Sequence, residues 1–191
     1  FQIHNLIIKT NLFLPELIEI KNTKDLNEQN IVEVFESNSL NTDFDFNSQW
    51  STHNVRFIKS KLLIHIEGIA VYLIEEGKRI TWKRWNNKVE NRDIRTFLLT
   101  SAVAALLAQR GNLLINGTCL TREGKSILLI GMPTTGKSTL AYSLFQNGWQ
   151  LVSSEICLLD ENNIVYPGLQ QIKLWFNSMK ALKIERKGVI K

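Results

Sequence analysis

A glycine-rich stretch near residue 130 limits what this chain can fold into more than any other feature. It fits the pattern G-x-x-x-x-G-K-[ST] at every position: Gly131, Met132, Pro133, Thr134, Thr135, Gly136, Lys137 and Ser138. The two glycines let the backbone curl, so that successive N–H groups point inward at an anion. The apolar run SILLIG precedes the stretch, and the helical pattern STLAYSLFQNG follows it. Together they predict a strand, a phosphate-binding loop (P-loop) and a helix.

The lysine and the serine of this motif have separate chemical roles. Lys137 supplies a cation for the β- and γ-phosphates of a nucleotide, and Ser138 offers its hydroxyl to Mg²⁺. The first turn of the following helix adds the positive end of its dipole. A plain glycine turn before a helix is the alternative, and the flanking strand and helix argue against it. We therefore expect residues 131–139, which end at Thr139, to bind ATP with Mg²⁺.

The order of the strands around the motif predicts an unusual sheet. The runs NLLINGTCL and SILLIG are joined by only a short turn, so they must pair antiparallel. After the helix come WQLVSSE, ICLLD and a returning strand NIVYPG, then QIKLWF as one more strand and a final helix SMKALKI capped by Asn177. Such hairpins predict an α/β fold with a mixed sheet in the P-loop domain, in place of a doubly wound parallel sheet.

A small β-rich region, residues 1–92, precedes the P-loop domain, residues 93–191. Its runs FQIHNLIIK, PELIEI and IVEVFE read as strands, and residues 37–54 read as a loop. The runs NVRFI, KLLIHIEG, IAVYLIEEG and KRITWKRW predict an antiparallel meander. The next stretch, DIRTFLLTSAVAALLAQRG, predicts one helix between an N-cap at Asp93 and a stop at Gly111. It is apolar almost all round, so we expect it to be buried.

Composition and charge exclude several classes of protein. The 191 residues carry 23 basic and 18 acidic side chains, a net charge of +5, and the whole excess lies in residues 173–191. A solvated end explains this basic tail better than nucleic-acid binding does, and the tail from Lys173 on is also a place where a partner peptide or phosphate could lie. The longest apolar run, residues 98–108, is too short to cross a membrane. Cys119 and Cys157 lie in apolar strands without a C-x-x-C pair, so we expect two core residues and a cytoplasmic protein.

Three stretches of the sequence resemble those of a known family. Residues 97–160 resemble the catalytic domain of HPr kinase/phosphorylase and its related proteins, and PGLQQIKLW resembles their Pro-Gly-x-x-x-Ile/Leu-x-Leu-Trp segment. The run LIIKTNLFLPEL before a β-rich region is similar to the related-kinase branch. The resemblance implies a P-loop fold shared with phosphoenolpyruvate carboxykinase, and ATP-dependent phosphorylation of a serine in a protein or peptide. Chains of the family usually continue beyond such a segment. Whether this domain is truncated stays an open question.

The chain departs from the family at two catalytic positions. Where the family has a His before the P-loop, this chain has Asn116, and where it has the first of two acids, this chain has Ser154. The second acid remains as Glu155, which with Ser138 is expected to hold the metal. Neither an amide nor a serine hydroxyl is a base at neutral pH. A serine kinase with Lys137 as its cation is therefore one hypothesis, and a nucleotide sensor or peptide-recruiting protein without kinase chemistry is the other.

The other candidates are weaker. Alternation in KLLIHIEG places His65 on a solvated face. The cluster around Trp82 and Trp85 suits a half-exposed strand end better than a stacking surface for bases, and the pair at 174–175 suits a core position better than a nucleotide contact. The phosphorylated substrate, the choice between ATP and GTP, and the oligomeric state, a homo-oligomer included, stay open.

Overall fold

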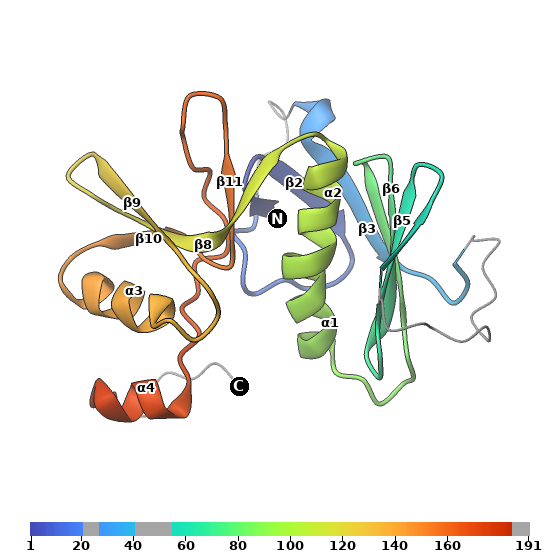
Figure 1. Ribbon diagram of the computed structural model, residues 1–191. Coiled ribbons are helices and arrows are strands. Elements are labelled where there is room, and N and C mark those ends of the chain that lie inside the picture. The colour runs from blue at the N-terminus through green and yellow to red at the C-terminus, as the bar shows by residue number, and fades with distance from the viewer. Residues whose placement is uncertain (21–26, 41–54, 185–191) are drawn as a thin grey trace.

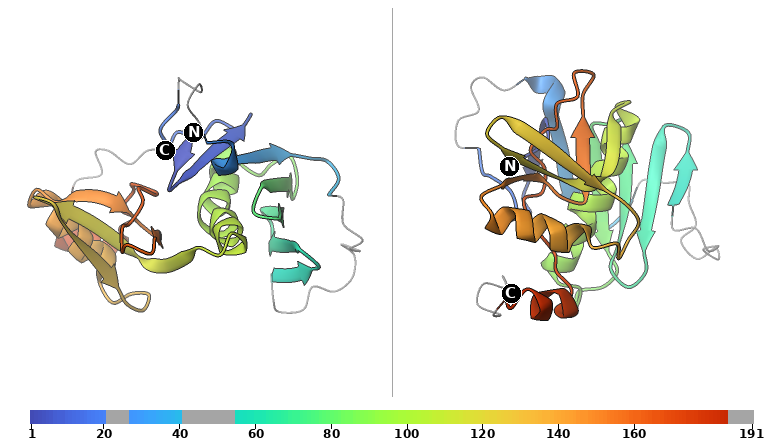
Figure 2. Two further views of the ribbon diagram at one scale, coloured as in Figure 1. Left: turned by 90° about the horizontal axis from the view of Figure 1, so that it is seen from above. Right: turned by 60° about the vertical axis from the view of Figure 1, so that its left-hand side comes forward.

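The computed structural model describes residues 1–20, 27–40 and 55–184, which form two sheets joined by one long helix (Figure 1). Seen from above, the two sheets lie on opposite sides of that helix (Figure 2). No helix of the described ranges is both long and apolar enough to cross a membrane.

The first sheet has seven strands and mixes parallel with antiparallel pairs. Its order is β1-β2-β3-β7-β6-β5-β4. The pairs β2–β3 and β3–β7 are parallel, and the run β4–β7 is the predicted antiparallel meander. The strands are β1 (Gln2–Ile3), β2 (Leu6–Thr10), β3 (Ile31–Glu36), β4 (Val55–Ile58), β5 (Lys61–Ile66), β6 (Ala70–Glu75) and β7 (Arg79–Arg84), with a short 3₁₀ helix at Glu28–Asn30 before β3.

Two predictions for this region are wrong, and one lies partly outside the described residues. The run PELIEI is no strand: it turns after Leu14, which is fully buried, and only Ile18 bridges to Gln2. His65 is not solvated but 4% exposed, with its ring centroid 5.4 Å from that of Trp85, because both faces of β5 are covered. Of the predicted loop at 37–54, residues 41–54 lie outside the described ranges.

The predicted central helix forms as one run with a wider turn in its middle. It consists of α1 (Asn91–Phe97), a π-helical turn (Leu98–Ala102) and α2 (Val103–Gln109). It begins earlier than predicted, with Glu90 rather than Asp93 at the N-cap, and Gly111 follows its end as predicted. One apolar side is buried against the first sheet, where the Tyr72 hydroxyl donates to the Ile94 carbonyl at 2.8 Å. The burial is thus one-sided, and not all round.

The second sheet carries the P-loop. It contains β8 (Leu113–Arg122), β9 (Lys125–Ile130), β10 (Gln150–Ser153) and β11 (Ile156–Leu159), and its helices are α3 (Lys137–Gln146) and α4 (Phe176–Ala181). β9 pairs with one part of β8, and β10 and β11 pair with β8 in succession, all antiparallel. The predicted P-loop hairpin is confirmed. The mixed sheet, however, is the seven-stranded one, since the described pairs of the P-loop sheet are antiparallel.

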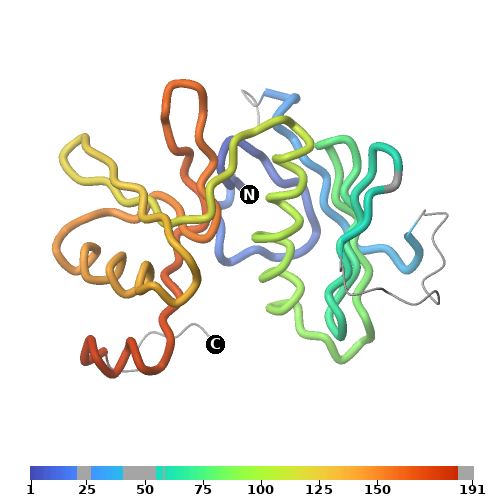
Figure 3. Tube along the Cα trace, in the orientation of Figure 1, coloured from blue at the N-terminus to red at the C-terminus, as the bar shows by residue number. Residues whose placement is uncertain are grey.

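The chain after β11 is less regular than predicted. The expected strand NIVYPG reduces to a single bridge of Val165 with Leu159, and the expected strand QIKLWF does not form. A second bridge, Leu169 with Ser154, lies between the two runs. Figure 3 shows this segment returning past β8 before it reaches α4. That helix has Trp175, not Asn177, at its N-cap. Trp175 is 78% exposed, so the expected core role of this side chain is wrong.

The two sheets share one hydrophobic core. Leu158 and Leu169 of the P-loop half belong to the same buried cluster as the central helix and the first sheet. The turn between β1 and β2 also reaches across, where the His4 amide donates to the Pro167 carbonyl at 2.6 Å. His4 is 4% exposed, and burial lowers the pKa of its imidazole to about 4, against a smaller opposing effect of a backbone hydrogen bond at Tyr166.

We expect the burial of the His4 imidazole to make the stability of the protein depend on pH. Between pH 6.5 and 4 the unfolded chain protonates His4 while the folded chain does not, so the free energy of unfolding falls as the pH is lowered. His4→Asn suits the positive φ of 53° at this position and removes the titrating group. The wild-type protein should lose about 3 kcal/mol more than the variant over this range. Urea unfolding of both proteins at several pH values measures the difference, and parallel pH profiles would contradict it.

Candidate functional site

The P-loop joins β9 to α3 in a conformation that depends on its glycines. Gly136 has a φ of 91°, in the left-handed region, and forms the N-cap of α3 without a side-chain hydrogen bond. At Gly131, a Cβ atom would lie 3.1 Å from the Thr135 hydroxyl oxygen, so the loop is closely packed at its entry. A side chain at either position would disturb the curl that the motif predicts.

Backbone amides and the lysine ammonium meet at the start of α3. The amide of Leu140 donates to the Gly136 carbonyl at 2.9 Å, so the amides of residues 137–139 have no carbonyl within the helix to bond. The Lys137 ammonium donates to the carbonyls of Gly131 at 2.6 Å and Met132 at 2.8 Å. It is thus held across the loop. Free amides beside a cation form an arrangement suited to phosphate.

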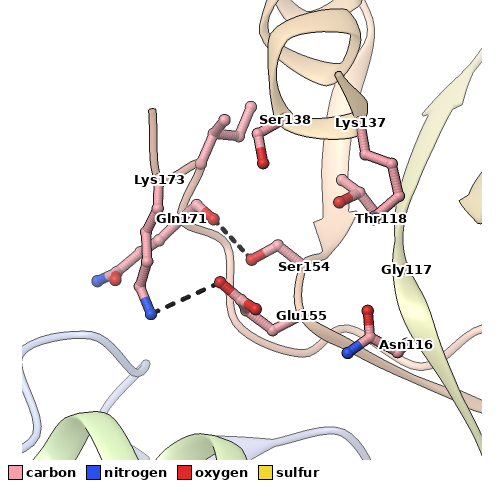
Figure 4. Close-up of a pocket in the computed structure, with 10 residues that line it drawn as sticks. Asn116, Gly117, Thr118, Lys137, Ser138, Ser154, Glu155, Gln171 and Lys173 are labelled. Atoms are coloured by element: carbon pink, nitrogen blue, oxygen red, sulfur yellow. Dashed lines mark hydrogen bonds and ion pairs between the residues drawn. The ribbon is translucent and has the colours of Figure 1, made fainter. Parts of the chain in front are cut away.

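One pocket gathers five of the predicted site residues, Asn116, Lys137, Ser138, Ser154 and Glu155, from segments far apart in the sequence (Figure 4). Residues 131–136 and Thr139 do not line it. β8 supplies one wall, the first turn of α3 a second, and the junction of β10 and β11 a third. The segment between Leu169 and α4 closes the fourth side. The lining residues are Asn116, Gly117, Thr118, Lys137, Ser138, Ser154, Glu155, Gln171, Ile172 and Lys173.

The strand register brings Asn116 beside Glu155. Asn116 pairs with Ile156, and the Gly117 amide donates to the Glu155 carbonyl at 3.2 Å. A Cβ atom at Gly117 would lie 2.8 Å from the Leu129 carbonyl oxygen, so this position accepts only glycine without a shift of β9. Asn116 itself is exposed.

Glu155 has a strained backbone. Its φ is 66°, in the left-handed region, which costs a residue other than glycine about 1 kcal/mol or more. Its carboxylate lies 3.6 Å from the Lys173 ammonium, and both side chains are about half exposed. The strained turn directs this carboxylate, the one acidic side chain among the described lining residues, into the pocket.

Ser154 is a structural anchor in this protein. Its hydroxyl lies 2.6 Å from the Gln171 carbonyl oxygen and 3.0 Å from that of Leu169, and its amide donates to the Leu169 carbonyl at 2.8 Å. The residue is buried. We call residues 169–173 the strap, because the hydrogen bonds from Ser154 hold this segment across the β10–β11 junction. The Ser154 hydroxyl is therefore engaged by backbone carbonyls of the strap.

Two other groups of residues have roles outside the pocket. The Thr139 hydroxyl donates to the Ser178 hydroxyl of α4 at 3.1 Å, so this side chain joins two helices. Cys119 and Cys157 are free and buried, as predicted for core residues. Burial raises the pKa of the Cys157 thiol to about 11 and also raises that of Cys119. Neither cysteine is a nucleophile near neutral pH.

The oxygen donors of the pocket fit Mg²⁺ that arrives with a nucleotide. Ser138 and Glu155 are hard oxygen ligands, and both line the pocket. The described ranges contain no group of three or more His, Cys, Asp or Glu that could hold a metal alone. Mg²⁺ is commonly bound by one or two carboxylates together with the phosphates of a substrate. Residues 131–139, with their free amides and Lys137, fit those phosphates.

Sequence reasoning missed the strap as part of the site. Lys173 counted only toward the basic tail, of which residues 185–191 lie outside the described ranges. Gln171 and Lys173 belong to the run PGLQQIKLW, so the resemblance of that run was the available signal.

The chain was compared with protein-family models, with curated proteins and with solved structures, and no match was found. Function is therefore inferred from the geometry of the site, together with the resemblance of its motifs.

We expect Ser154→Ala to destabilise the protein although it removes a single oxygen. The change leaves the Gln171 carbonyl without its donor, whereas the Leu169 carbonyl keeps the backbone amide of residue 154. We expect a cost of about 1–2 kcal/mol in the free energy of unfolding. Ser126→Ala, on the exposed part of β9, is the matched control and should change it by less than about 0.5 kcal/mol. Urea denaturation measures both, and equal stabilities would show that Ser154 is no anchor.

Proposed function

We propose that this protein binds ATP with Mg²⁺ through residues 131–139 and transfers the γ-phosphate to a serine of a protein or peptide. The observation that carries the proposal is the pocket, in which Lys137 and Ser138 of the P-loop lie with Asn116, Ser154 and Glu155. The resemblance to HPr kinase/phosphorylase implies that Asn116 and Ser154 stand at catalytic positions and that Glu155 stands beside the metal. The two free cysteines suit a reducing compartment, which favours the cytoplasm.

Each residue has a defined role in this proposal. Lys137 stabilises the charge on the transferring phosphoryl group, and Ser138 with Glu155 would hold the metal, which neutralises charge on the phosphates when bound. Phosphoryl transfer depends mainly on positioning and electrostatics, so the loss of one base does not abolish it. Asn116 does not titrate, and the Ser154 hydroxyl is bonded to the strap. Glu155 is the only carboxylate among the described residues that line the pocket, and it would take the proton of the acceptor hydroxyl only by moving away from the metal.

A second function is favoured by the state of Ser154. Its hydroxyl and amide are engaged by the strap, and a positioned base contributes about 10²–10⁴-fold to such a reaction. A protein that binds the nucleotide as a sensor, or recruits a peptide to a neighbouring enzyme, needs no base. This alternative keeps the same P-loop and the same role for Lys137 in binding.

Titration calorimetry tests the binding that both functions share. We expect the wild-type protein to bind ATP in the presence of Mg²⁺, and Lys137→Ala to weaken binding by about tenfold or more, since a charge-assisted contact to phosphate is lost. Lys125→Ala, on the exposed end of β9, is the control and should bind like the wild type. If the wild-type protein binds no ATP, both functions are excluded.

Phosphate transfer distinguishes the two functions. Purified protein is incubated with γ-³²P-ATP and peptides that contain serine, with Mg²⁺ or Mn²⁺, beside the double variant Asn116→His, Ser154→Asp. Transfer by the wild-type protein, increased about 10²-fold or more by the double variant, supports the kinase. Transfer by the double variant alone supports the sensor. Circular dichroism of both proteins controls for the loss of the Ser154 anchor.

A further inference from the structure

The strap places a second lysine, Lys173, at the wall of the pocket. Lys173 lies two residues beyond Gln171, whose carbonyl accepts from Ser154, and the strap is also fixed by the buried side chain of Leu169. The position of the Lys173 backbone is therefore determined by the fold. Figure 4 shows its side chain on the side of the pocket away from Lys137, with Glu155 between them.

The charges of the pocket are unbalanced toward the positive. Among the described residues that line it, Lys137 and Lys173 carry positive charge and Glu155 alone carries negative charge. The Lys173 ammonium lies 3.6 Å from that carboxylate, and both side chains are exposed to solvent, with 53% and 42% of their surfaces accessible. Such an exposed pair is weak, and the flexible lysine stem allows its ammonium to exchange partners.

We propose that Lys173 is a second phosphate-binding cation, which binds the terminal phosphate of a nucleoside triphosphate and is held by Glu155 until that phosphate arrives. The inference depends on the proposed nucleotide binding and adds a determinant of which nucleotide is retained. The phosphates nearest the start of α3 contact the loop amides and Lys137. A phosphate further out lies toward the strap, within the reach of a lysine side chain.

Two consequences follow from this arrangement. The protein distinguishes a triphosphate from a diphosphate, because only the longer chain of phosphates reaches Lys173. When Lys173 leaves Glu155, the carboxylate is freed at the same time, and it is then available to Mg²⁺. Lys173 therefore links the presence of a terminal phosphate to the availability of the metal ligand.

Calorimetry with ATP and ADP, each in EDTA and in Mg²⁺, tests the inference on the full chain. Lys173→Ala should weaken ATP binding by about tenfold and ADP binding by less than about twofold. Lys173→Arg should keep most of the preference for ATP. Lys180→Ala, a nearby exposed lysine on α4 that does not line the pocket, is the matched control and should change neither affinity.

Glu155→Gln supplies a second, opposite test. Removal of the carboxylate releases Lys173 in advance, so ATP binding in EDTA should become a few-fold tighter, whereas the gain from adding Mg²⁺ should shrink. If Lys173→Ala weakens ATP and ADP binding equally, or weakens neither, while Lys137→Ala still weakens ATP binding by about tenfold or more, the inference is wrong and the proposed function stands. If the wild-type protein binds no nucleotide, both are wrong.

Discussion

Strand β8 is paired along both of its edges, and the position of each site residue depends on these two ladders. One ladder holds β9 and so the entry to the P-loop, and the other holds β10 and β11 with the junction at Ser154 and Glu155. Side chains alternate between the faces of a strand, so a slip of one residue would turn Asn116 away from the pocket. The site is thus defined by backbone hydrogen bonds before any side chain contributes chemistry.

The features predicted from sequence are those encoded locally. The P-loop, the hairpin before it and the central helix depend on short patterns, and all three are present. The parallel pairing of β2 with β3 and of β3 with β7 joins segments far apart in the chain, and no local pattern encodes it. His65 was misplaced for the same reason, because strand alternation predicts a solvated face only where nothing distant covers it.

The residues of the candidate site also divide into those that a local sequence pattern identifies and those whose position depends on distant contacts. Lys137 and Ser138 were identified from the motif itself, and Asn116, Ser154 and Glu155 from a resemblance that supplied positions without geometry. Lys173 was missed because its place in the pocket depends on the Ser154 hydroxyl and on the burial of Leu169. In sequence it is one lysine in a basic tail. The exposed position of Trp175 was missed likewise, since an aromatic side chain next to a leucine is more typical of a core.

Asn116 and Gly117 are neighbours in sequence but differ in how freely they can be replaced. The side chain at 116 extends into an open pocket, so its chemical nature can change with little effect on the ladder. A side chain at 117 would press on the backbone of β9 and displace the strand that leads into the P-loop. The chemical character of the pocket at residue 116 and the strand packing at residue 117 are therefore encoded in adjacent codons that mutate independently. A lineage with this fold can gain or lose a titrating group in one step while its phosphate loop keeps its shape.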